Sequence, residues 1–66
     1  TKATLYMILA HSGVVAASVE NPTFVPRVDE FVQLVYDATG RPVRYRVQSV
    51  SHEYSRHSMT ITVMLG

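Results

Sequence analysis

The sequence predicts an all-β fold, a small five-stranded and strongly bent antiparallel barrel that forms a single domain over residues 1–66. In the run from 59 to 65, Met59, Ile61, Val63 and Leu65 share one face and Thr60 and Thr62 share the other, which is the pattern of a strand with one buried face. The run from 44 to 54 also alternates, but its apolar phase shifts by one residue near Gln48-Ser49. Turn-forming residues separate the remaining short apolar runs, as in small β-barrels and sandwiches.

The phase shift predicts a β-bulge near Gln48-Ser49. Tyr45 and Val47 share one parity, whereas the following apolar positions 50, 52 and 54 share the other. A slip of one residue would expose half of the apolar side chains unless an extra residue absorbed it. We therefore expect one long, bent strand that forms a hairpin with the last strand through a turn at 55–57.

The first apolar run, residues 3–11, can be interpreted either as a strand or as a short helix. Both of its faces are apolar, so its periodicity does not decide between them. Ala, Leu and Met favour a helix, while Thr, Tyr and Ile favour a strand. We expect a strand, because Ser12-Gly13 resembles a turn into a second β-type run at 14–20.

An irregular connection is expected over residues 21–27. It begins at the turn dipeptide Asn21-Pro22, and Pro22 and Pro26 both push the preceding residue into an extended conformation. Phe24 lies between the two prolines, and we expect it to close the base of the core.

A third strand is expected at 31–36, followed by a turn at Asp37–Gly40. Asp at the first position and Gly at the fourth suit a type I turn, in which Gly40 is free to adopt positive φ. Arg41-Pro42 then keeps the chain extended into the long strand.

Three segments together resemble small SH3-like β-barrel proteins of unassigned role, which are encoded by bacteria, phages and mobile elements. They are Pro26–Val32, Tyr45–His52 and Thr60–Val63, with a glycine-containing hairpin between the first two. Glycine often stands in that pattern where this chain has Asp29, and Asp tolerates the left-handed backbone conformation better than most residues. The resemblance covers residues 26–65. It implies an SH3-like barrel and no catalytic residue.

The small size of the chain favours self-association. A domain of this length buries only about 60% of the surface that its unfolded chain exposes. The chain has no cysteine, and its three histidines do not match a zinc-ligand spacing, so disulfides and metal ions are not expected to supply the missing stability. We expect a homo-oligomer whose interface lies on the first strand, at Leu5, Tyr6, Met7, Ile8 and Leu9.

The net charge of +1 is far from the strongly basic balance of a general nucleic-acid binder. No apolar run approaches the roughly 18 residues that span a bilayer. A cytoplasmic protein without a membrane partner is the expectation.

Candidate ligand-binding residues are Arg44, Arg46, Tyr45 and Arg56. Arginines could hold phosphates while an exposed tyrosine stacks on a base. The alternative is a solvated strand face, in which arginine stems cover apolar surface. No cofactor is expected.

Catalysis has little support in the sequence. His52, Glu53 and His57 could form an acid–base pair or a metal site, but consecutive strand residues point to opposite faces. We therefore expect a non-enzymatic binding or assembly module that self-associates. The alternatives are a phosphate-directed binder of nucleic acid or a small nucleotide, and a small hydrolase or metal enzyme.

Overall fold

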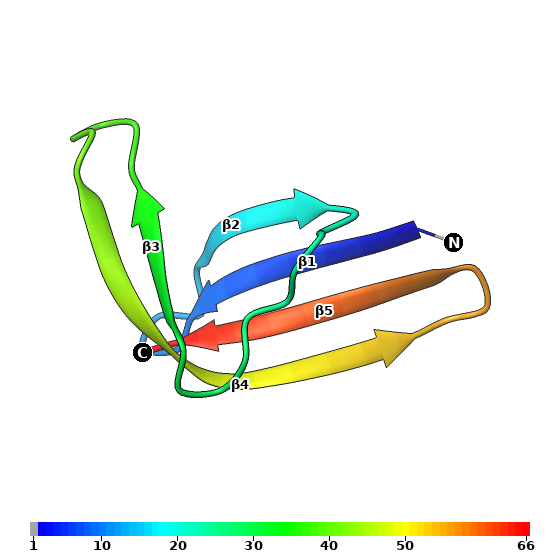
Figure 1. Ribbon diagram of the computed structural model, residues 1–66. Helices are drawn as coiled ribbons and strands as arrows, with labels where there is room; N and C mark the ends of the chain where they lie inside the picture. Colours follow the sequence, from blue (N-terminus) through cyan, green and yellow to red (C-terminus); the bar gives the residue numbers. More distant parts are fainter. Residues whose placement is uncertain (1) are drawn as a thin grey trace.

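The computed structural model describes residues 2–66 as a single five-stranded sheet, and it contains no helix in that range (Figure 1). The strands are β1 (Lys2–Leu9), β2 (Val15–Glu20), β3 (Phe31–Val35), β4 (Pro42–Tyr54) and β5 (Ser58–Leu65). Their order in the sheet is β2-β1-β5-β4-β3. The predicted all-β, five-stranded fold is confirmed, including the strand interpretation of the first apolar run.

The sheet is mixed, which corrects the expectation of a fully antiparallel barrel. β1 and β5 pair in parallel from Lys2–Ser58 to Leu9–Leu65, and the other three neighbouring pairs are antiparallel. Alternation of side chains predicts which residues share a face but not the direction in which a strand runs. Because β2 and β3 do not pair with each other, the sheet curls into a half-barrel with two free edges.

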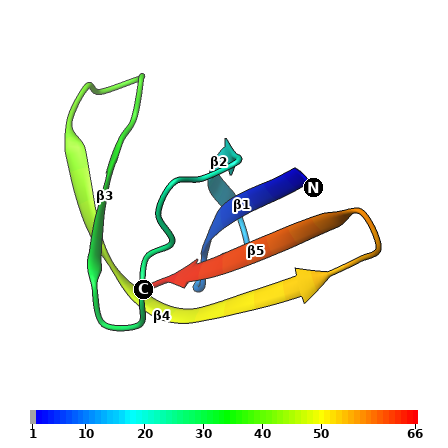
Figure 2. The same cartoon turned by 45° about the vertical axis from the view of Figure 1, so that its right-hand side comes forward.

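The predicted bulge is confirmed at the bend of β4. The register with β5 shifts between Val47 and Ser49, so that Gln48 has no partner residue on β5. β4 pairs with β3 before this point and with β5 after it. Figures 1 and 2 show the consequence, since the β3–β4 hairpin bends away from the rest of the sheet. An extra residue bends its strand and increases the local twist, as a half-barrel requires.

The connections on either side of β3 both contain left-handed backbone. Gly40 has a φ of 66° and donates its amide to the Tyr36 carbonyl at 2.7 Å, so the turn begins one residue earlier than predicted. Asp29 has a φ of 73°, which is the left-handed conformation expected at a position where the SH3-like pattern often has glycine. Its amide donates to the Val47 carbonyl, and the Val47 amide donates to the Glu30 carbonyl, both at 2.9 Å. These bonds attach the two residues that precede β3 to the bend of β4.

The core is small and lies on the concave side of the sheet. It consists of five fully buried side chains, which are Leu5, Val47, Ile61, Val63 and Leu65. Phe24, expected to close the core, is instead 85% exposed, because the connection that carries it runs along the open side of the half-barrel and no other element within residues 2–66 covers it. A single folded sheet has only one concave side on which to bury residues, which limits this core to a few side chains.

Candidate functional site

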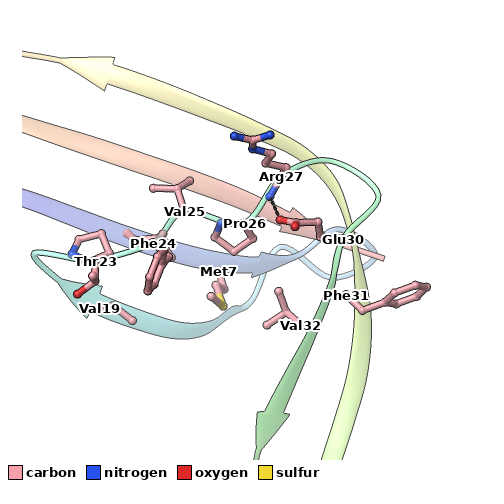
Figure 3. A pocket seen from close by; sticks show the side chains of 12 residues that line it. Met7, Val19, Thr23, Phe24, Val25, Pro26, Arg27, Glu30, Phe31 and Val32 are labelled. Carbon is pink, nitrogen blue, oxygen red and sulfur yellow. Dashed lines mark hydrogen bonds between the residues drawn. The ribbon is translucent and has the colours of Figure 1, made fainter.

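A large apolar cavity opens on the concave side, between the free edges β2 and β3 (Figure 3). Its volume is about 810 Å³, and we call it the β2–β3 slot. It is lined by residues of β1 (Leu5, Met7), β2 (Val19), the β2–β3 connection (Pro22, Thr23, Phe24, Val25, Pro26, Arg27, Glu30) and β3 (Phe31, Val32). The slot is the space that a closed barrel would fill with its own side chains.

Strand periodicity directs the apolar side chains into the slot. Leu5 lies opposite Val19 in the antiparallel pair β1–β2, so these two side chains share the concave face with Met7. Val32 enters from the other side, where it lies opposite Tyr45 in the pair β3–β4. Figure 3 shows Met7, Val19 and Val32 around the space, with Phe24 beside them on the connection.

The connection from 21 to 30 is attached firmly at its two ends. At the first end, Asn21 has a φ of 50°, its amide donates to the Ala3 carbonyl at 2.7 Å, and its Oδ1 accepts the Ala3 amide at 3.2 Å. At the second end, the Arg27 amide donates to Glu30 Oε1 at 2.6 Å. Between them, the main chain of residues 23–25 forms no hydrogen bond with any part of the chain from 2 to 66. This middle segment is extended, and its donors and acceptors are unused.

The charged residues of the slot lie at one end only, and the polar residue Thr23 lies at the other end, where it is exposed. The charged residues are Arg27 and Glu30, and both side chains are exposed. Within residues 2–66, no polar side chain is buried, so the floor of the slot offers no fixed hydrogen-bonding group. A smaller cavity of about 450 Å³ lies on the far side of the connection, between Val25–Val28 and the β4 residues Val50 and His52.

The structure brings together two of the four predicted ligand-binding residues. Arg44 and Arg46 project from the same face of β4, opposite the strand residues Gln33 and Phe31. The Arg44 guanidinium carbon lies 3.9 Å from the centroid of the Phe31 ring, in cation–π geometry. Arg46 donates to Asp29 Oδ1 through Nη2 at 2.7 Å and Nε at 3.1 Å. Arg44 thus stacks on an aromatic ring, while the charge of Arg46 is paired.

Tyr45 and Arg56 lie elsewhere. Tyr45 points to the concave face, and its hydroxyl lies 2.8 Å from that of Tyr36. This hydrogen bond, together with burial, raises the pKa of Tyr45 above its usual value of 10.0. Arg56 lies in the β4–β5 turn, beyond the opposite end of β4 from Arg44. These two residues do not converge with the Arg44–Arg46 pair.

The residues predicted as an oligomer interface divide between the two faces of β1. Leu5 is fully buried and belongs to the core of this chain, and Met7 and Leu9 pack against that core. Tyr6 and Ile8 point to the convex face. Both edges of β1 are occupied, by β2 and by β5. Any contact through this strand would therefore have to use a face of the sheet rather than a free edge.

The residues considered for catalysis are also separated. His52 lies opposite Ile61 on the concave side, whereas Glu53 lies opposite Thr60 on the other face, and His57 belongs to the β4–β5 turn. Among residues 2–66 there is no group of three or more His, Cys, Asp or Glu placed to hold a metal ion. No helix capable of crossing a membrane occurs in the same residues. Nothing in this arrangement points to a catalytic centre.

Comparison with protein-family models, with curated proteins and with solved structures finds no match to this chain. The resemblance to SH3-like barrels over residues 26–65 therefore stays a prediction, and the function has to be argued from the geometry alone.

Sequence reasoning missed the slot. The sequence places Phe24 at the base of the expected core, and Val19 and Val32 lie within the expected strands at 14–20 and 31–36 without any further signal. The available signal was a large aromatic residue between two prolines in a segment with no strand periodicity. Such a residue has no neighbouring strand to cover it, which favours exposure.

Proposed function

We propose that this protein is a non-enzymatic assembly module that functions as a homo-oligomer, with the open side of the half-barrel as its contact surface. The proposal unites the predicted self-association with the slot between β2 and β3. A cytoplasmic location stays an expectation from the sequence.

The observation that carries this proposal is the area of the surface. The chain exposes 4899 Å². A folded monomer of 7.4 kDa is expected to expose roughly 4,200 Å². The excess of about 700 Å² is close to the roughly 800 Å² that each partner contributes to a protein–protein interface of ordinary size. The surplus is what a subunit separated from its partner would show.

The composition of the surface supports the same conclusion. Ten large apolar or aromatic side chains are exposed in residues 2–66, against only five buried in the core. Several of the ten border the slot or its connection, namely Val19, Phe24, Val28 and Phe31. Contiguous apolar surface of this kind is typical of interaction sites. The net charge of +1 provides little repulsion between copies.

Sedimentation velocity over a range of about 1–100 μM, the range in which interfaces of modest quality form, tests the proposal. We expect a sedimentation coefficient that rises with concentration from the value of a 7.4 kDa monomer toward that of a dimer or a higher oligomer. A monomer at every concentration would rule out self-association as the function.

A second candidate function, phosphate-directed binding, is favoured by one observation at the β3–β4 hairpin. Arg44 stacks on Phe31, which is 56% exposed, and Arg44 forms no ion pair with any carboxylate in residues 2–66. A guanidinium and a ring held together in solvent offer a charge for a phosphate and a face for a base. One unpaired arginine is a small electrostatic footprint, so we rank this candidate second.

Binding of a fluorescent single-stranded oligonucleotide tests this second candidate. If the surface binds phosphates, replacing both arginines (Arg44→Ala with Arg46→Ala) weakens binding and reduces its dependence on salt. Arg56→Ala is the control for a general loss of positive charge, because it removes one arginine from the β4–β5 turn, beyond the opposite end of β4. Unchanged affinity in the double variant would remove the candidate.

A further inference from the structure

We propose that the partner at the β2–β3 slot is a second copy of this chain, and that Phe24 of each copy inserts into the slot of the other. This inference rests on the proposed function and specifies its contact. The pair would be a two-fold symmetric dimer, in which each copy supplies one Phe24 and one slot.

The arrangement of the open side is self-complementary. Phe24 is the most exposed large apolar residue of the chain, at 85%, and it stands at the border of the slot rather than within its floor. In a two-fold interface the same patch of both copies is in contact, so the projecting ring of each copy lies opposite the slot of the other. A single patch that contains both features therefore closes into a dimer without any further surface.

The slot fits a side chain of another copy better than a small ligand. Small-molecule sites combine an apolar lining with a few polar groups that fix the orientation of the ligand. Here no polar side chain is buried in residues 2–66, and the two charged lining residues, Arg27 and Glu30, lie exposed at the rim. An aromatic side chain that arrives on its own backbone needs no such groups.

The backbone beside Phe24 is also available to a partner. Residues 23–25 form no main-chain hydrogen bond with any residue between 2 and 66, and β2 and β3 present free strand edges on either side of the slot. An extended segment with unused donors and acceptors can pair with an exposed strand edge of another chain. The segment that carries Phe24 thus has polar contacts within reach once the ring is inserted.

The area is consistent with one contact of this kind. The surplus surface of about 700 Å² per chain corresponds to a single interface of ordinary size and not to several. We therefore expect a dimer and not an extended filament.

Sedimentation of two matched variants tests the role of Phe24. Phe24→Ala is expected to raise the dimer dissociation constant by about thirtyfold or more, as truncation of an aromatic hot spot does. Tyr54→Ala is the control, since it removes another exposed aromatic ring (72% exposed) at the far end of β4, and it should leave the dissociation constant unchanged. Circular dichroism should be native in both variants, because neither ring is buried.

The outcomes separate the two levels of the proposal. A wild-type monomer would overturn both the proposed function and this inference. A wild-type dimer that Phe24→Ala leaves intact would overturn the inference alone, and self-association would stand. Val19→Asp, which changes the slot rather than the projection, should weaken the dimer as Phe24→Ala does. Loss of the dimer in Phe24→Ala but not in Val19→Asp would overturn insertion into the slot.

Fluorescence provides an independent measurement, because the chain contains no tryptophan. In Phe24→Trp the indole becomes the only tryptophan, and its emission should shift to shorter wavelength as the protein concentration rises through the dissociation constant. Tyr54→Trp should show no such shift. Equal emission from Phe24→Trp in its monomeric and dimeric forms would contradict the inference.

Discussion

Val47 is the residue on which the bent sheet depends most. Its side chain is 0% exposed, and its amide and carbonyl form hydrogen bonds with Glu30 and Asp29, the two residues that precede β3. It also precedes the bulge at which β4 passes from one pairing partner to the other. Truncation to alanine would remove packing from the junction of both arms of the half-barrel without changing any main-chain bond.

The expected cost follows from the size of the deletion. Val47→Ala removes two carbon atoms, worth about 0.8 kcal/mol each in transfer free energy, and leaves a cavity that adds to the loss. We expect the free energy of unfolding to fall by about 2–3 kcal/mol. A 66-residue domain has a total stability of roughly 3–10 kcal/mol, so the variant would lose a large share of it.

Urea denaturation followed by circular dichroism measures this loss, with wild type and variant at the same protein concentration. Val35→Ala is the matched control, because this valine lies on the edge strand β3 and is 64% exposed. Its substitution should cost less than about 1 kcal/mol, the span of strand propensities. Equal losses in the two variants would refute the assignment of Val47 to the centre of the core.

Two further predictions concern the backbone and the tyrosine pair. Asp29→Gly should leave the melting temperature unchanged or raise it, since glycine adopts the left-handed conformation freely and the exposed ion pair with Arg46 contributes only about 0–1 kcal/mol. Asp29→Val should lower the melting temperature by several degrees, because a β-branched residue disfavours positive φ. Equal melting temperatures of the two variants would contradict this reasoning. The folded protein holds the Tyr45 proton more tightly than the unfolded chain, so the stability from this site is complete below about pH 10 and is lost as pH rises through the higher folded-state pKa. Absorbance titration of the tyrosines at alkaline pH should show the late-titrating group in wild type and its return toward pH 10 in Tyr36→Phe; no difference between them would contradict the role of the Tyr36 hydroxyl.

Much of the fold could be predicted because strand periodicity reports directly on which face is buried. The alternation in β5 predicted the inward side chains of that strand, which supply three of the five core residues. The phase shift in β4 predicted the bulge between Val47 and Ser49. The positive φ of Gly40 and Asp29 could be expected from residue type. Each of these features is determined by residues next to one another in the sequence, either through strand alternation or through the backbone preference of one residue type.

The remaining features depend on pairing between distant segments. The parallel contact of β1 with β5 joins the two ends of the chain, and no local pattern specifies its direction. The exposure of Phe24 follows from the position of β2 and β3 at the two edges of the sheet, where they do not pair with each other, and this is a property of the whole sheet. Since the slot exists only because the barrel is incomplete, it could not be predicted from a sequence interpreted as a closed barrel.

The concentration dependence of unfolding tests the central claim most directly. If the half-barrel is completed by a second copy, folding and association are linked. At concentrations above the dissociation constant of the dimer, the apparent stability then rises by about 1.4 kcal/mol of dimer for each tenfold increase in protein concentration. We predict that the urea midpoint and the melting temperature of the wild type increase from 1 to 100 μM. If the protein is folded at every concentration before denaturation and the unfolding curves still superimpose over this range, the five-residue core is sufficient alone. That result would contradict the account.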